Sequence, residues 1–467
     1  MLKYLIFLFV LFNVLFVRSQ TNQGNSNPNY IVNKIEFQGN HKTKAYILQR
    51  ELIFDIGDTL SESELNAKLT KSKENLLNLS LFNFVTIEYS SDKNKQINFL
   101  VQVVERWYLW PQIILDIPGQ NINTWLRTTD LSKVNYGIWL AQGNFRGRNE
   151  VLKLRFGLGF DEQLGVSYSL PYINKKLTTG ISLEALYIQN HQAMIELLNN
   201  KRQYIRTNNQ YLRKSIMMGL GMNLRRNIYN THIVKLSYQN DHFADTLALI
   251  NPEFTGNRQI TNHYFSLYYK YKNDLRDNKS YPLKGHYFDV EYQQNGFDFM
   301  NDNIDYGFLH SSYRRFMHLF DGYYYQFTLN GLYNMGSKQP FYLRRDVGGE
   351  ADEVSGYEYY LIPCNYSLSI RNNLKVTLLK PHVFKFGFIP WEKFSKIHYA
   401  FYLNVFSTYS FIKNKTPDIL NSLGNSWLFA SGVGIDFVTY YDKVFRFEVS
   451  LNRKNEMGFF IHLNSAL

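Results

Sequence analysis

The stretch VLKLRFGLGF at residues 151–160 alternates apolar side chains with lysine, arginine and glycine. The same two-residue period recurs at residues 234–239 (VKLSYQ), 288–293 (FDVEYQ) and 445–452 (FRFEVSLN). Successive side chains of a β-strand point to opposite faces, so each stretch predicts a strand with one apolar and one polar face. Such strands suit a transmembrane β-barrel, whose outer face meets lipid and whose lumen is wet. A soluble sandwich or propeller is the alternative, and it would need the charged face outside.

The amino-terminal residues 1–19 combine one lysine, a long apolar run and a small residue near the end. This pattern predicts a signal peptide, followed by a flexible polar tail at residues 20–28, with an N-terminal anchor helix as the alternative. Downstream no run of about eighteen apolar residues occurs, so no second membrane helix is predicted. An exported chain that enters a membrane must then close its sheet into a barrel, because an open edge would leave unpaired backbone groups in lipid. A bacterial outer membrane fits these features better than an organelle.

The composition is aromatic and basic, with 36 Tyr, 36 Phe and a formal charge of +12 across 467 residues. A nucleic-acid binder and a surface against phosphate-rich lipid both fit such a charge. Lys and Arg are spread along the predicted strands, so we expect outer-membrane lipids as partners and no nucleic acid. The single Cys364 cannot form an internal disulfide, and no Cys/His set with metal-ligand spacing occurs. We therefore predict neither a metal nor a cofactor.

The number of alternating segments predicts about sixteen antiparallel strands, an even number that permits closure. The barrel is expected at residues 133–467, after a linker at residues 107–132 that leads into it. A long loop at residues 334–365 separates the eleventh strand from the twelfth, and its aromatic load is typical of a functional loop. The strands are expected to begin near residues 133, 150, 163, 180, 203, 214, 230, 262, 285, 304, 322, 366, 397, 427, 445 and 458.

Residues 29–106 form a smaller α+β unit in front of the barrel. Apolar residues at helical or alternating spacing, and the capping-box pattern of Ser61 to Glu64, mark its elements. These elements are a strand at residues 30–37, helices at residues 44–54 and after Ser61, and strands at residues 84–89 and 96–104. The chain is therefore predicted to be mainly β, with a head of order β-α-α-β-β.

The head resembles a POTRA domain, the module that precedes outer-membrane assembly barrels. The matching positions are Gly39-Asn40, Thr43-Lys44, Gly57-Asp58, Asn75-Leu76 and residues 81–85 (LFNFV). The second part resembles the BamA/TamA-like barrels of the bacterial surface antigen type, especially short Bacteroidetes-type members, here with one POTRA domain. Its matching stretches are residues 105–111, 144–150, 274–277, 281–285, 354–360 and 434–437.

This resemblance implies a protein that assists the insertion or translocation of outer-membrane proteins. The periplasmic head would capture a strand of a client or of a partner envelope subunit at its sheet edge. The seam between the first and last strands would then open laterally, which lowers the cost of placing unpaired backbone in lipid. The alternatives are a structural or accessory subunit of a larger envelope complex, a passive channel, or a head that is only a spacer.

In this family a long extracellular loop folds back into the lumen and carries a hydrophobic-Arg-Gly-aromatic motif. The resemblance implies that the motif Arg pairs with acidic groups on nearby strands, and Asp436 matches one such position. Because Ser355 stands where the Arg is usual, this attachment is expected to be degenerate, which motivates the accessory-subunit alternative. The loop motif comprises Val354, Ser355, Gly356, Tyr357, Tyr359 and Tyr360, and a periplasmic turn motif comprises Asp274, Arg276, Pro282 and Gly285.

No catalytic motif is present at the spacing that known chemistry requires. GxSxG, HExxH, P-loop and dinucleotide patterns are all missing from the sequence. We therefore predict no enzyme activity, with a barrel phospholipase as the alternative, because its residues would assemble only in space.

Overall fold

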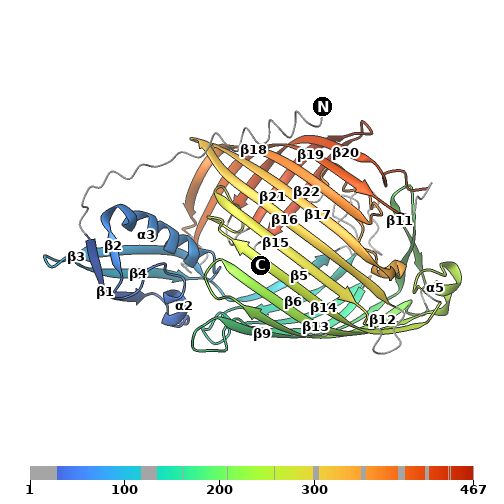
Figure 1. The fold of residues 1–467 in the computed structure, drawn as a ribbon, viewed down its shortest axis with the longest axis horizontal. Coiled ribbons are helices and arrows are strands. Elements are labelled where there is room, and N and C mark those ends of the chain that lie inside the picture. Colours follow the sequence, from blue (N-terminus) through green and yellow to red (C-terminus); the bar gives the residue numbers. More distant parts are fainter. Residues whose placement is uncertain are drawn as a thin grey trace.

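The protein, seen in a computed structural model, consists of a small head and a β-barrel that lie side by side along the long axis (Figure 1). The structure describes residues 29–116, 134–159, 161–207, 209–256, 258–297, 304–348, 354–387, 395–415, 420–439, 441 and 443–465. The predicted signal peptide and tail lie outside the described residues, as do residues 117–132 of the predicted linker. Among the described residues, no helix has the length and apolar character needed to cross a membrane.

The head is a four-stranded sheet with two helices. Its elements are β1 (Asn29–Gln38), α2 (Ala45–Gln49), β2 (Thr59–Ser61), α3 (Glu62–Leu77), β3 (Phe82–Ser91) and β4 (Gln96–Glu105). The sheet order is β2-β1-β4-β3, with β1 parallel to β4, so β3 forms one edge. Leu48, Leu76 and Val101 are buried in the core between helices and sheet. The predicted order β-α-α-β-β is confirmed, and the short strand β2 is added between the helices.

The barrel is one sheet of sixteen strands in which neighbours are antiparallel, which confirms the predicted number. The ladders link the strands in chain order from β5 to β22, with β9 joined directly to β12. These strands are β5 (Leu109–Asp116), β6 (Asn135–Gln142), β7 (Val151–Gly159), β8 (Asp161–Leu170), β9 (Thr179–Asn190), β12 (Arg213–Leu224), β13 (Asn230–Phe243), β14 (Thr261–Asp274), β15 (Gly285–Asn295), β16 (Asp305–Phe320), β17 (Tyr323–Lys338), β18 (Tyr366–Lys385), β19 (Lys396–Lys413), β20 (Trp427–Thr439), β21 (Lys443–Asn452) and β22 (Met457–Ser465).

Two predicted boundaries and one predicted barrel strand are wrong. The linker at residues 107–132 contains β5, so the barrel begins before residue 133; Pro111 and an apolar run hide the alternation of this strand. Proline is tolerated there because β5 is an end strand of the sheet. The segment near residue 203 is β11 (Lys201–Arg206), which pairs with β10 (Gln192–Leu198) in a separate hairpin. The long loop begins after Lys338 instead of at residue 334, because β17 continues to that residue.

The two faces of the barrel strands differ as the alternation predicts. On β7, Leu154 and Phe156 are 45% and 54% exposed on the outer face. On β21, Arg446 and Glu448 point inward and are buried, while Phe447 between them is exposed. The apolar face therefore meets the surroundings of the barrel and the charged face meets its lumen.

The two ends of the barrel carry different structures. The head packs against the turns at one end, for example where Asn78 after α3 donates to the carbonyl oxygens of Arg276 and Asp277. The opposite end carries the β10–β11 hairpin and the short helix α5 (Asp245–Ile250) (Figure 1). The loop from β17 to β18, which includes the single turn η2 (Phe341–Leu343), also begins and ends there. We refer to these ends as the head side and the far side.

Candidate functional site

The lumen loop, residues 339–365, enters the barrel from the far side. Val354 and Tyr357 are buried in one apolar cluster with Ile412 of β19 and other wall residues. Gly356 has a φ of +83°, and a Cβ at this position would lie 2.6 Å from the Cβ of Ala430. Glycine is therefore required where the loop approaches the wall, since any side chain would clash there and strain the backbone.

Tyrosines of the lumen loop bind the last two strands of the sheet. The hydroxyl of Tyr359 donates to the carbonyl oxygen of Phe459 on β22, at 3.3 Å. The hydroxyl of Tyr360 donates to the carboxylate of Glu456, in the turn between β21 and β22, at 2.7 and 2.8 Å. Displacement of β22 would therefore break contacts that also hold the loop.

The loop position Ser355 is bound by an arginine that the barrel wall supplies. Nη1 of Arg371, on β18, donates to Oγ of Ser355, and both residues are buried. Nη2 of Arg371 lies 3.5 Å from Oε2 of Glu448, and its guanidinium lies 4.5 Å from the ring centroid of Phe406. A guanidinium thus lies between loop and strand although the loop itself carries a serine.

Among the described residues, Asp436 forms no hydrogen bond with the lumen loop, where Ser355 replaces the arginine that would pair with it. Its carboxylate accepts from Arg446 on the neighbouring strand β21, at 2.7 and 3.1 Å. The second partner is Tyr281, whose hydroxyl donates to Oδ2 at 2.8 Å. Asp436 therefore anchors the turn that carries Tyr281, which enters from the head side. Its ion pair with Arg446 forms because β20 and β21 place the two residues opposite each other in register.

That turn, residues 275–284, and the strand ends of β14 and β15 that flank it contain the predicted periplasmic motif. Arg276 forms a bidentate pair with Asp274 at 2.7 and 2.8 Å. Tyr281 enters the lumen, where Nζ of Lys375 lies 4.2 Å from its ring centroid and 3.5 Å from the carbonyl oxygen of Pro282. Gly285, at the start of β15, has a φ of +99°. The turn therefore occupies the lumen from the head side, opposite the lumen loop.

A buried ion pair joins the head to the barrel. Arg225, after β12, donates to both carboxylate oxygens of Glu51 at 2.7 and 2.8 Å, and to the hydroxyl of Tyr172 at 2.8 Å. Arg50 donates through Nε to the carbonyl oxygen of Leu177 at 2.7 Å. Charge-assisted bidentate pairs fix orientation as well as distance, so this cluster holds the head in one pose.

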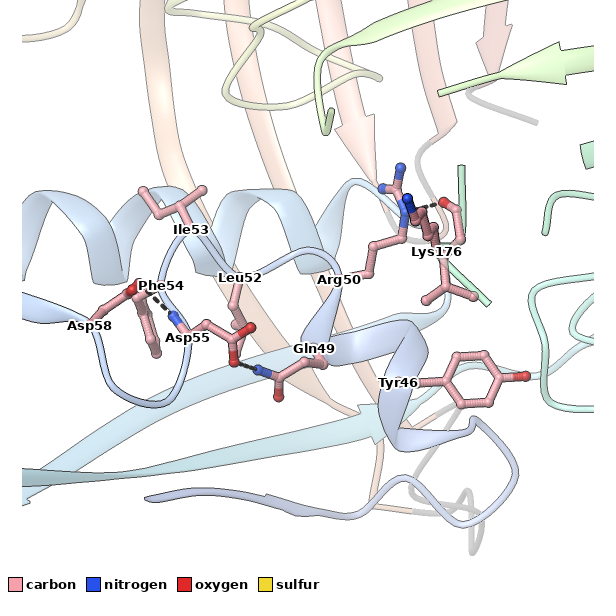
Figure 2. Close-up of a pocket in the computed structure, with 10 residues that line it drawn as sticks. Tyr46, Gln49, Arg50, Leu52, Ile53, Phe54, Asp55, Asp58 and Lys176 are labelled. Carbon is pink, nitrogen blue, oxygen red and sulfur yellow. Dashed lines mark hydrogen bonds between the residues drawn. The ribbon is translucent and has the colours of Figure 1, made fainter. Parts of the chain in front are cut away.

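A cavity of about 450 Å³ lies beside this junction (Figure 2). Tyr46, Phe54 and Asp55 of the head line it, together with Lys176 and Leu177 of the turn between β8 and β9. The lining mixes aromatic and charged groups and includes no cluster of metal ligands among the described residues.

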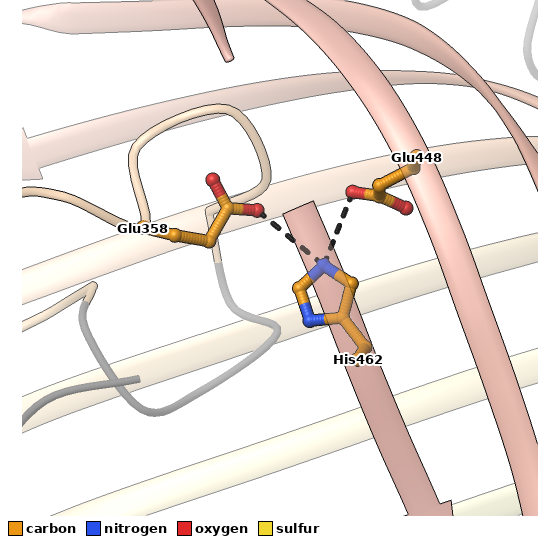
Figure 3. Close-up of side chains that lie close together, drawn as sticks. All are labelled: Glu358, Glu448 and His462. Carbon is orange, nitrogen blue, oxygen red and sulfur yellow. Dashed lines mark ion pairs between the residues drawn. The ribbon is translucent and has the colours of Figure 1, made fainter. Parts of the chain in front are cut away.

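Three side chains with metal-ligating chemistry meet inside the barrel (Figure 3). Nε2 of His462, on β22, lies 3.4 Å from Oε1 of Glu448 on β21 and 3.9 Å from Oε1 of Glu358 in the lumen loop. Burial, and then the nearby carboxylate of Glu448, raises the pKa of Glu358 to about 7. Among the described residues this is the one group of three or more His, Cys, Asp or Glu side chains with that geometry.

The sequence analysis did not single out Arg371, Glu448 or His462 as site residues. Arg371 and Glu448 occupy polar positions of alternating strands, which is the only signal that could have selected them. That signal gives the face of the strand, whereas the partner on that face depends on where the loop folds.

The fold and these contacts define a class of protein. It is a sixteen-stranded barrel whose lumen receives a segment from each end, preceded by a head domain whose sheet has an exposed edge strand. The chain belongs to the Omp85 superfamily. The Omp85 superfamily domain matches residues 144–437, and the POTRA family described as a surface antigen variable number repeat matches residues 30–106. Membership indicates an outer-membrane barrel of the protein insertion and translocation type; family members are transporters or assembly factors, with their POTRA domains in the periplasm.

Two solved structures are similar to this chain at low sequence identity. BamA from Haemophilus ducreyi lacking POTRA domains 1–3 is 14% identical with a TM-score of 0.49; the match covers 95% of this chain and 84% of that one. CdiB from Escherichia coli is 11% identical with a TM-score of 0.50, and the match covers 96% and 92% of the two chains. At such identities the likeness to CdiB concerns the fold alone. A search of curated protein sequences found no match.

Proposed function

We propose that this chain assists the assembly of other outer-membrane proteins by strand capture at its head and by lateral release at a seam between β5 and β22. The observation that carries the proposal is the position of these two strands at the ends of the barrel sheet. An end strand can exchange its backbone partners with an incoming strand, because the rest of the sheet stays intact.

Three contacts set the ease with which the seam would open. On the head side, the ring of Trp110 at the start of β5 packs edge-on against Tyr441, between β20 and β21, with centroids 4.6 Å apart. The backbone N–H of Trp107 donates to the hydroxyl of Tyr441 at 3.4 Å. On the other side of the seam, the lumen loop holds β22 through Tyr359. Opening therefore requires the loss of these contacts.

The head offers a matching capture surface. Strand β3 is the edge of the head sheet, and most of its residues from Thr86 to Ser91 are exposed. Backbone groups on such an edge accept an extended segment as an added strand. In this proposal the rigid junction at Glu51 and Arg225 keeps that edge at a constant position relative to the barrel.

The test is depletion of the protein in its native cell, followed by quantitative proteomics of the isolated outer membrane. A broad loss of barrel proteins is expected. Loss of a single complex, or of none, would instead favour an accessory subunit, the second candidate that the serine at position 355 motivates.

A passive channel is disfavoured by two segments that occupy the lumen, the lumen loop from the far side and the turn with Tyr281 from the head side. In planar bilayers we expect the intact protein to show no steady open conductance. A stable open level with both segments in place would contradict this part of the proposal.

A further inference from the structure

We propose that Glu358, Glu448 and His462 form a binding site for a divalent transition-metal ion, which would tie the lumen loop to the last two strands. Zn²⁺ is the probe for this site. The site itself stands on the geometry below, and only its consequence for the seam rests on the proposed function.

The donor atoms already lie near the positions that such an ion requires. The two distances from Nε2 of His462, 3.4 and 3.9 Å, belong to a set in which all donor atoms lie within 4.8 Å of one another. Ligands around tetrahedral Zn²⁺, at metal distances near 2.0–2.2 Å, are about 3.4 Å apart. A small movement of the Glu358 side chain, which belongs to a loop, would bring its oxygen close enough for the three donor atoms to occupy three corners of a tetrahedron around the ion.

The chemistry of the set favours a metal of intermediate softness. Two carboxylates and one imidazole are ligands that suit zinc and similar ions, whereas calcium prefers oxygen alone. All three side chains are largely removed from solvent, with side-chain exposures of 7%, 0% and 15% for Glu358, Glu448 and His462. Few water molecules would therefore compete with these side chains as ligands of a bound ion.

A cation would add a close partner for the buried carboxylate of Glu448. Glu448 is fully buried, and its contacts with His462 and Arg371, at 3.4 and 3.5 Å, are longer than the 2.7–2.9 Å of a close charge-assisted hydrogen bond. Buried carboxylates need compensation by paired charge or by a metal.

The three ligands join the lumen loop to the two strands on one side of the seam. Glu358 belongs to the lumen loop, Glu448 to β21 and His462 to the end strand β22. A bound ion would add a cross-link among them to the tyrosine contacts of the same loop. Occupancy would therefore hold β22 against the loop, and removal of the ion would release it.

The test uses the full-length protein, purified in detergent, stripped with a chelator and titrated with Zn²⁺ against a chromogenic competitor. One equivalent is expected to bind, and zinc X-ray absorption should report a single imidazole with oxygen ligands. The variants His462→Gln and Glu448→Gln should each weaken binding by more than about 100-fold, since loss of an outer partner alone costs 10- to 100-fold. His41→Gln, at an exposed histidine of the head, is the matched control and should bind as the wild type does.

The variant Glu358→Gln decides the matter if a strand variant fails to fold, because this residue lies outside the barrel strands. It should weaken binding while the barrel keeps its heat-modifiable migration on gels. Absence of saturable binding at micromolar Zn²⁺, or binding that Glu358→Gln leaves unchanged, would overturn the proposal. The cluster would then be an ion-pair network with a protonated histidine.

Discussion

Arginine introduced at position 355 is expected to displace the lumen loop instead of anchoring it. The family resemblance suggests a different arrangement, in which an arginine at this loop position pairs with acidic groups on nearby strands. In the structure, Ser355 already receives Nη1 of Arg371, so Ser355→Arg places two guanidinium groups in the same buried space. Two like charges about 4 Å apart repel by about 4 kcal/mol at an effective dielectric constant near 20. Glu448, 3.5 Å from Arg371, relieves part of this, so we expect a loss of about 2–4 kcal/mol.

Hydrogen exchange of the loop amides measures this loss directly. The amide of Leu361 donates to the carbonyl oxygen of Asn200, outside the loop, at 2.8 Å, and this bond exists only when the loop is docked. The amide of Ile362 donates to Val347 within the loop, also at 2.8 Å, and reports the fold of the loop itself. Exchange of these amides in Ser355→Arg should be faster by about 30- to 1000-fold, since 1.4 kcal/mol corresponds to about a factor of ten. Peptides covering residues 354–362 in the full-length protein report it by mass spectrometry.

Two further variants separate charge from size. Ser355→Met adds a long side chain without charge and should cost only the overpacking of about 1–3 kcal/mol. The double variant Ser355→Arg with Arg371→Ser restores a single guanidinium and should recover most of the protection. The reasoning is refuted if Ser355→Arg exchanges no faster than the wild type, or if the double variant is no better protected than the single one.

Three other outcomes are expected. Arg225→Gln leaves Glu51 buried without its bidentate partner and should weaken head docking by about 3 kcal/mol. The weaker docking should appear as a broader distance distribution between spin labels on the head and the barrel, and Arg226→Gln at the exposed neighbour should behave as the wild type. Burial lowers the pKa of Lys279 to about 8, so between pH 8 and 10.5 the unfolded state binds more protons than the folded state and stability should rise with pH. Chemical denaturation measures this slope, and the same slope in Lys279→Met as in the wild type would contradict the prediction. Tyr281→Phe removes a hydrogen bond to a carboxylate and should lower thermal stability by about 1.5–3 kcal/mol, and an unchanged melting temperature would count against an anchored turn.

The architecture could largely be predicted from the sequence because it depends on local periodicity. Alternation at residues 152–158 and 445–452 assigned each side chain to an outer or an inner face, and the exposures of Phe156 and Glu448 agree. The head was also predictable, since its helices and strands have distinct apolar spacing.

Strand pairing was less accessible to sequence reasoning. The segments Leu109–Asp116 and Lys201–Arg206 have similar lengths and neither is clearly alternating, yet only the first joins the barrel. Membership of a sheet depends on hydrogen bonds to strands that are distant in the chain. A local pattern cannot specify those partners.

The site shows the same division. By itself the sequence determined that the loop motif carries Gly356, three tyrosines and a serine at position 355, because motif and composition are properties of one segment. Only the tertiary structure decided that Arg371 contacts that serine and that His462 and Glu448 meet Glu358. Those contacts arise because the loop folds back onto strands up to about a hundred residues away in the chain. The physical reason is packing, since Gly356 lacks the side chain that would clash with Ala430 of the barrel wall.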